Sequence, residues 1–194
     1  MKTVINMYLT LASVIIAGIA NMIFTKTKLY KRYNRPIDGG KILNDGKRVL
    51  GNNKTIIGFI SMIIFNILAQ LICGNIYKTL GISSSLELYQ EFNNMWINNI
   101  IIGFLFGFAY MICEIPNSFV KRRLDINPGK TDKGIKGIIF LVIDQIDSLI
   151  GVVLVLNIIS DIGIIKSIMY VILGAFTHIS INFILYKLKI RRNI

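Results

Sequence analysis

Several residue types are scarce in this 194-residue sequence, which holds two cysteines, three prolines and one histidine. So few cysteines exclude a small secreted domain held by disulfides, and with one histidine they offer no zinc-type cluster. Acidic residues are also scarce: 10 Asp and Glu stand against 22 Lys and Arg, a net charge of +12. Yet 54% of the chain is hydrophobic, and its mean hydropathy is +0.62. Such a chain must keep apolar and charged residues apart, which is typical of an integral membrane protein.

Five apolar runs are long enough to cross a bilayer as helices. They cover residues 3–25, 55–77, 96–115, 137–159 and 164–186. A hydrocarbon core of about 30 Å takes roughly 20 helical residues, and a helix satisfies its own backbone groups there. The sequence therefore predicts an all-α integral membrane protein with about five transmembrane helices, folded as a single membrane-embedded domain over residues 1–194.

The basic residues lie between and after these runs. Nineteen of the 22 Lys and Arg fall in residues 26–54, 116–136 and 187–194. Because Lys and Arg collect on the cytoplasmic side, we expect two long basic cytoplasmic loops, a cytoplasmic C-terminus and an N-terminus outside the cell membrane. The first run is expected to remain as a helix, since its positive cluster follows the apolar stretch, unlike that of a cleaved signal peptide. The same placement explains the charge without a nucleic-acid partner.

Asp144 and Asp147 lie inside the fourth apolar run. Three residues apart, they share one helix face, and counted from Gly137 they lie roughly 10–15 Å into the helix. A carboxylate at that depth is costly unless it lines a cavity or meets a cation, so the pair is a candidate site for a hard divalent cation such as Mg²⁺. The alternative is a buried ion pair or a hydrogen-bonded packing contact. The lack of Lys and Arg inside the predicted spans counts against it.

A second cluster follows the third apolar run, where residues 118–123 read S-F-V-K-R-R. If that helix continues past Pro116, Glu114 lies about two turns before the cations, although a proline can kink a helix. The cluster places Lys121 and Arg122 at the membrane surface, where they can meet anions. Ordinary basic flanking of a membrane helix is the alternative explanation.

A third cluster is the loop over residues 35–55, in which glycines are spaced among cations. Glycines let a backbone approach phosphates closely. Lys54 and Thr55 lie at the start of the second apolar run, where the helix dipole favours an anion. The loop is not a P-loop, because the spacing G-x-x-x-x-G-K is absent. A flexible solvated loop is the alternative.

In order and spacing, the three clusters resemble the CTP:phosphatidate cytidylyltransferase superfamily of membrane enzymes. Residues 53–58 read N-K-T-I-I-G, similar to its N-K-T-x-x-G, and residues 118–122 and 144–148 resemble its S-x-x-K-R and D-R/Q-x-D. The CDP-archaeol synthase branch is closer. It carries P-I-D-G-G-K, then D-G-R-R and then G-K-T, much like residues 36–55 here. It also carries K-R-R before a D-Q-x-D, as this sequence does at residues 121–123 and 144–147. The resemblance covers most of residues 35–155.

The resemblance implies a nucleotidyltransferase that moves CMP from CTP to a phosphate-bearing membrane lipid and releases pyrophosphate. It leaves open whether the CDP-activated product is of the CDP-archaeol type or the CDP-diacylglycerol type. The implied ligands of Mg²⁺, or of Mn²⁺, are Asp144, Asp147 and Glu114. The implied catalytic residues are Asp144, Asp147, Lys121, Arg122 and Lys54. The implied CTP-binding residues are Asn53, Lys54, Thr55, Asp38, Gly39, Gly40, Ser118, Lys121 and Arg122.

The sequence also departs from the family's pattern. Cys113 and Glu114 stand where the family usually has Gly-Asp, Asn117 replaces a commonly charged residue, and the proline often found before the D-Q-x-D is missing. These departures support an alternative function, a catalytically degenerate homologue acting as a membrane scaffold or transport component. The retained aspartates and cations favour the enzyme, for which the family's habit suggests a homodimer.

Overall fold

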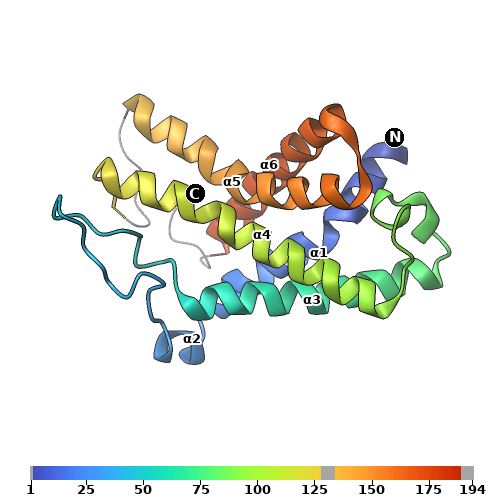
Figure 1. Cartoon of the computed structure of the whole chain (residues 1–194), viewed down its shortest axis with the longest axis horizontal. Helices are drawn as coiled ribbons and strands as arrows, with labels where there is room; N and C mark the ends of the chain where they lie inside the picture. Colours follow the sequence, from blue (N-terminus) through green and yellow to red (C-terminus); the bar gives the residue numbers. More distant parts are fainter. Residues whose placement is uncertain (1, 128–133, 189–194) are drawn as a thin grey trace.

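A computed structural model describes residues 2–127 and 134–188 (Figure 1). The long helices are α1 (Lys2–Phe24), α3 (Ile56–Thr79), α4 (Trp96–Arg123), α5 (Gly134–Ser160) and α6 (Gly163–Lys187). The short ones are α2 (Lys28–Arg32), η1 (Ser83–Ser85) and η2 (Glu87–Tyr89). Five of these helices are long and apolar enough to cross a membrane, and the described residues form no strand. The predicted all-α, five-span fold is therefore confirmed.

α4 lies at the centre of the bundle. It packs along α3 on one side and α5 on the other, while α1 lies against α3 and α6 against α5. Gly103 and Gly107 of α4 form a G-x-x-x-G at this contact: a Cβ on Gly103 would lie 2.6 Å from the Ile67 Cα and one on Gly107 2.7 Å from the Ile63 Cα. The backbones of α3 and α4 therefore touch where side chains would otherwise separate them.

The outer faces of the helices are apolar. Ile158 on α5 is 83% exposed and Ile164 on α6 is 74% exposed, and many other large apolar side chains also face outward. In water such a surface would be an aggregation hazard. In a bilayer it contacts lipid tails, so the side-chain arrangement agrees with the membrane assignment made from helix length.

α4 is longer than the sequence predicts. The apolar run ends at residue 115, but the helix continues through Pro116 to Arg123. Hydropathy marks only where the apolar residues stop, and the helix carries its basic residues onward for two more turns. The last turns of α4 therefore hold Ser118, Lys121 and Arg122 in helical register instead of in a loop.

The two connections at opposite ends of the bundle differ in length and structure. Residues 80–95 form a compact link with η1 and η2, in which Leu86 and Leu88 are fully buried. Residues 33–55 form a longer loop held by isolated antiparallel bridges that pair Pro36 with Thr55 and Ile42 with Arg48. In Figure 1 this longer loop lies beside the C-terminal end of α4.

Candidate functional site

The two aspartates of α5 meet at the side of α4. The Nδ2 atom of Asn117 donates to the Oδ1 of Asp144 at 2.7 Å and to the Oδ2 of Asp147 at 2.6 Å. One amide group can bond both only because the carboxylates lie on one face of α5, as their spacing predicts. The Oδ1 of Asn117 is buried and has no hydrogen-bond partner among the described residues. Three oxygen-bearing side chains therefore converge where α4 and α5 cross.

Two lysines reach the same place from different elements. Lys121, on the last turn of α4, forms an ion pair with Asp144, and Lys54, just before α3, forms one with Glu114. Our expectation that the aspartates lack a basic partner is wrong, because it assumed that the third helix ends before Lys121. The extended α4 carries this lysine to the carboxylates. The buried ion pair, given above as the alternative to a cation site, therefore forms at the same residues as the candidate site.

Lys54 stays charged despite its burial. Burial opposes the charge, but Glu114 and, more remotely, Asp147 and Asp144 raise the pKa of Lys54 above its ordinary value. Its ammonium group therefore supplies a positive charge at physiological pH. Asp144 is the more open partner of its ion pair, with 40% of its side chain exposed against 16% for Lys121. The cluster is thus accessible on one side.

The carboxylate oxygens of Asp144 and Asp147 are suitable ligands for a hard divalent cation. Within residues 2–127 and 134–188, no three His, Cys, Asp or Glu side chains converge on a point that could hold a metal ion. Glu114 lies at the site, but its carboxylate is engaged by Lys54, so the expected three-carboxylate set is not preformed. Asp144, Asp147 and the amide of Asn117 offer only oxygen ligands once the amide is turned, and Mg²⁺ completes such a site with phosphate or water oxygens.

Asp38 organises the long loop. Its carboxylate accepts from the backbone N–H of Gly40 at 3.0 Å and of Leu50 at 2.9 Å, and from the Arg48 guanidinium at 2.6 Å. Desolvation opposes ionisation, but these hydrogen bonds hold the pKa of Asp38 below its usual value. Only 3% of the side chain is exposed. Asp38 therefore holds the shape of the loop, and its implied contact with CTP stays a prediction.

The loop is fastened to the end of α4. The backbone N–H of Gly51 donates to the Ser118 hydroxyl at 3.1 Å. Lys47 donates to Asp125 at 2.7 Å, and Arg123 pairs with Asp45. These contacts place the loop over the same helix turns that carry the site lysine.

Three of the predicted CTP-binding residues, Thr55, Gly39 and Gly40, lie outside the cluster around Asp144. Thr55 is 1% exposed, and its hydroxyl accepts from the Gly58 N–H at 3.1 Å and bonds the Tyr30 hydroxyl at 2.9 Å. It therefore caps α3 and is not positioned to donate to a phosphate, which corrects our expectation. Gly39 and Gly40 are exposed, with φ of 59° and 83°, a conformation that favours glycine.

Asn53 is exposed on the loop before α3. Among residues 2–127 and 134–188, no hydrogen bond or ion pair joins it to the cluster around Asp144. Of the predicted residues, the structure brings together Asp144, Asp147, Glu114 and Lys54 with Lys121. Ser118 and Arg122 lie on the neighbouring face of α4, toward the loop.

Two residues contribute to the site without a motif that marks them in the sequence. Asn117 only departs from the family's pattern, although its position four residues before Lys121 places both on one helix face. Arg48 was one of many cations in the loop, and no local spacing links it to Asp38 or to α4. The first could have been found from helical periodicity, while the second depends on the fold of the loop.

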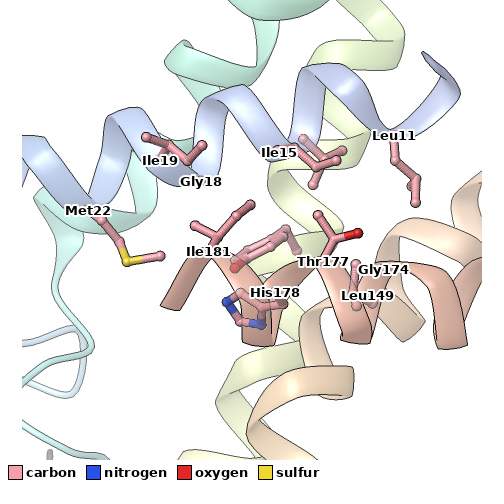
Figure 2. A pocket seen from close by; sticks show the side chains of 12 residues that line it. Leu11, Ile15, Gly18, Ile19, Met22, Leu149, Gly174, Thr177, His178 and Ile181 are labelled. Carbon is pink, nitrogen blue, oxygen red and sulfur yellow. The ribbon is translucent and has the colours of Figure 1, made fainter. Parts of the chain in front are cut away.

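An apolar pocket lies between α1 and α6 (Figure 2). Its walls include Leu11, Ile15, Ile19 and Met22 of α1, and Gly174, Thr177, His178 and Ile181 of α6. Tyr110 of α4 and Leu149 of α5 also line it.

Comparisons with known proteins agree on one family. Residues 4–193 match the family described as CarS-like, CDP-archaeol synthase. The CDP-archaeol synthase of Methanocaldococcus jannaschii is 31% identical over 156 residues, covering 80% of this chain and 81% of that protein. That of Sulfolobus acidocaldarius is 30% identical over 159 residues, covering 80% of each.

A solved structure has the same fold. It is described as an intramembrane enzyme for archaeal membrane lipid biosynthesis, and it matches with a TM-score of 0.56 at 22% identity, over 91% of this chain and 92% of that one. At this identity the likeness concerns the fold alone.

Proposed function

The chain belongs to the CDP-archaeol synthase family, and we propose that it performs that family's reaction at the cluster of Asp144, Asp147, Lys121 and Lys54. It is a membrane cytidylyltransferase of lipid biosynthesis that forms CDP-archaeol from CTP and a lipid phosphate. The observation that carries the site assignment is the bridge from Asn117 to both aspartates, with two ion-paired lysines beside it. The site is part of a single domain over residues 1–194.

The reaction joins two anions, CTP and the lipid phosphate, which repel each other. The two lysines reduce this repulsion. An oxygen of the lipid phosphate attacks the α-phosphorus of CTP, the bond from that phosphorus to the oxygen leading to the β-phosphate breaks, and pyrophosphate leaves with the electron pair. Lys54 and Lys121 offset the charge that gathers around the α-phosphorus. Their carboxylate partners hold them at the site before substrates arrive, so little reorganisation is needed.

Asp144 and Asp147 are the residues that would hold Mg²⁺ or Mn²⁺. Such an ion supplies positive charge to phosphate oxygens and aligns them for displacement. Asn117 keeps the two carboxylates side by side in the protein without substrates. Without that amide the like charges would repel across the helix face.

The pocket between α1 and α6 is suited to a hydrocarbon chain of the lipid. Its lining is apolar apart from Thr177, His178 and Tyr110. Replacing Gly18 of α1 by Leu should fill the pocket, because Gly18 also lines it and a Cβ there would meet no atom within 4 Å. The KM for the lipid phosphate should rise while the KM for CTP stays unchanged.

The site should face the cytoplasm, where CTP is found. This places the N-terminus outside and the C-terminus inside. In an otherwise cysteine-free protein, an impermeant thiol reagent should label Ser84→Cys from outside and Asn44→Cys only from inside, since both positions are exposed. The opposite pattern would contradict the site's orientation. We also expect the purified protein to be a homodimer, which its mass in detergent by light scattering tests.

Incorporation of radiolabelled CTP into lipid by the purified protein tests the function. We expect a CDP-lipid with an isoprenoid ether lipid phosphate, dependent on Mg²⁺ or Mn²⁺, and less with diacylglycerol phosphate. A protein that folds but labels neither lipid with either ion would instead be a degenerate homologue acting as a scaffold or transport component.

A further inference from the structure

The cations at the end of the bundle that carries the candidate site fall into two groups. Those of the first group each form an ion pair with a carboxylate: Lys47, Arg48, Lys54, Lys121 and Arg123. Those of the second group are exposed, and no ion pair joins them to an acid among residues 2–127 and 134–188: Lys26, Lys28, Lys31 and Arg32. Residues 25–37 contain no Asp or Glu. The second group is therefore a local excess of positive charge.

The second group lies on and beside α2, which the fold holds in place. Thr27 caps this short helix, because its hydroxyl accepts from the Tyr30 N–H at 3.2 Å. The buried Tyr30 ring packs edge-on against Phe24, with 5.8 Å between the ring centroids. Its hydroxyl bonds the Thr55 hydroxyl at 2.9 Å. A folded and anchored element therefore presents these cations.

The anchors place α2 at the boundary of the apolar region. Phe24 is the last residue of α1, and Thr55 directly precedes α3, so α2 lies where two membrane spans end. In Figure 1, α2 lies beside the first turns of α3, off the side of the bundle. An element that projects sideways at the ends of membrane helices lies among the lipid head groups.

α2 also exposes apolar side chains beside its cations. Leu29 is 55% exposed and Tyr33 is 51% exposed, and residues four apart are neighbours on a helix surface. By the same spacing, Lys28, Lys31 and Arg32 share one face. The Arg32 guanidinium lies 5.6 Å from the centroid of the Tyr33 ring. Interfacial helices bind a bilayer with this combination, because the apolar side chains enter the acyl boundary while the cations meet phosphates.

We propose that residues 26–33 form a binding surface for anionic phospholipids of the surrounding bilayer, the α2 patch. A soluble anion would contact only the cations. A phospholipid contacts the cations through its phosphate and Leu29 through its hydrocarbon chains, so it uses both parts of the patch. The inference goes beyond the proposed function and is independent of it, because binding requires neither CTP nor a reaction.

A local fluorescent reporter tests the patch in the full-length protein in detergent. An environment-sensitive dye on Asn34→Cys, an exposed position next to Tyr33, in an otherwise cysteine-free protein reports binding at the patch and not at the candidate site. We expect phosphatidylglycerol to bind at least about tenfold more tightly than phosphatidylcholine. This preference should weaken as salt screens the charges.

The test variant combines Lys28→Gln, Lys31→Gln and Arg32→Gln and should lose the preference for phosphatidylglycerol. The matched control combines three exposed substitutions elsewhere and should keep it: Lys41→Gln, Lys78→Gln and Lys187→Gln. The two variants have the same net charge. An equal loss in both would overturn the proposal, because net charge alone would then explain the preference. An unchanged preference in the test variant would also overturn it.

Free phosphate distinguishes a lipid surface from a site for soluble anions. Inorganic phosphate and glycerol phosphate, at the concentration of lipid that saturates the dye signal, should not displace phosphatidylglycerol. Displacement by either would mean that the cations alone form the site, and the proposal would be wrong.

A second measurement leaves the charges in place, so it decides the question even if the triple variant does not fold. In lipid nanodiscs containing phosphatidylglycerol with brominated chains, the dye at position 34 should be quenched. The same dye on Asn44→Cys, exposed on the long loop, should not be quenched. Equal quenching at both positions, or none at position 34, would refute the α2 patch and leave the proposed function untouched. Failure to form a CDP-lipid would refute the function and leave the patch untouched.

Discussion

Polar side chains at the end of the bundle near residues 80–95 are mostly neutral and bond to one another, whereas those at the opposite end are charged and open to the surface. In the first group, the Gln70 side-chain amide donates to the Tyr89 hydroxyl at 3.0 Å and to the Asn99 carbonyl oxygen at 3.1 Å. The Tyr89 hydroxyl donates to the same oxygen at 2.6 Å. This network is buried and closed, so it joins α3, α4 and η2 and offers nothing to a ligand.

The charged end is organised differently. Asp144 pairs with Lys121 and Glu114 with Lys54, yet 40% of the Asp144 side chain is exposed. A partly exposed charged side chain can leave its ion-pair partner and bind a charged substrate instead. A side chain in the buried neutral network cannot change partners in this way without local unfolding. We therefore expect substitutions at the two ends to affect different quantities, activity at one and stability at the other.

The largest expected effect is at the aspartate pair. Asp147→Asn and Asp144→Asn should each lower CDP-lipid formation by at least ~100-fold, since losing a ligand or a key charge commonly costs ~3 kcal/mol of transition-state stabilisation. Both variants should still insert and purify, because Asn is nearly isosteric and less costly in a membrane. Labelled CTP incorporation, normalised to folded protein, measures this. A folded Asp147→Asn protein with near-wild-type turnover would remove the site assignment.

Lys121→Ala should come next, with a loss of about tenfold or more in kcat/KM for CTP, because a charge-assisted contact to phosphate is removed. The control is Lys187→Ala, which removes a cation that lies over the Phe183 ring and flanks the membrane. We expect little change there. Equal, small losses in both variants would mean that these lysines only set the topology.

At the neutral end, Gln70→Leu should lower stability and leave catalysis alone. Leaving the buried Tyr89 and Asn99 groups with fewer partners should cost about 1–3 kcal/mol of unfolding free energy. Thermal unfolding in detergent measures the loss, and kcat per folded molecule should match the wild type. A large fall in kcat without a fall in stability would contradict the division between the two ends.

The smallest effect concerns Asp38, and it depends on pH. Because the pKa of Asp38 is lowered in the folded protein, its contribution to stability is present above the usual value of 3.8 and is lost as pH falls below it. Asp38→Asn should therefore cost about 1 kcal/mol at neutral pH and progressively less as pH falls below 3.8. Melting temperatures of both proteins across this range test the idea. A constant difference at all pH values would refute it.

The sequence predicts much of this arrangement and misses parts for definite reasons. Helix length and apolarity predict the five spans, and a spacing of three predicts that Asp144 and Asp147 meet. The ion pair to Lys121 was missed because hydropathy ends a helix where the charges begin. The role of Thr55 was misjudged because its partner, Tyr30, belongs to a separate short helix. Contacts made by the folded loop have no local signal.

The length of α4 has a consequence for where the reaction occurs in the membrane. Its 28 residues span about 42 Å at 1.5 Å per residue, against a hydrocarbon core of about 30 Å. The excess carries Lys121 out of the hydrocarbon to the level of the phospholipid head groups. A lipid phosphate already lies in that plane, so the substrate can arrive by diffusing sideways in its leaflet, with its tails still immersed, and the product can leave by the same route. The enzyme then never has to lift a lipid out of the bilayer.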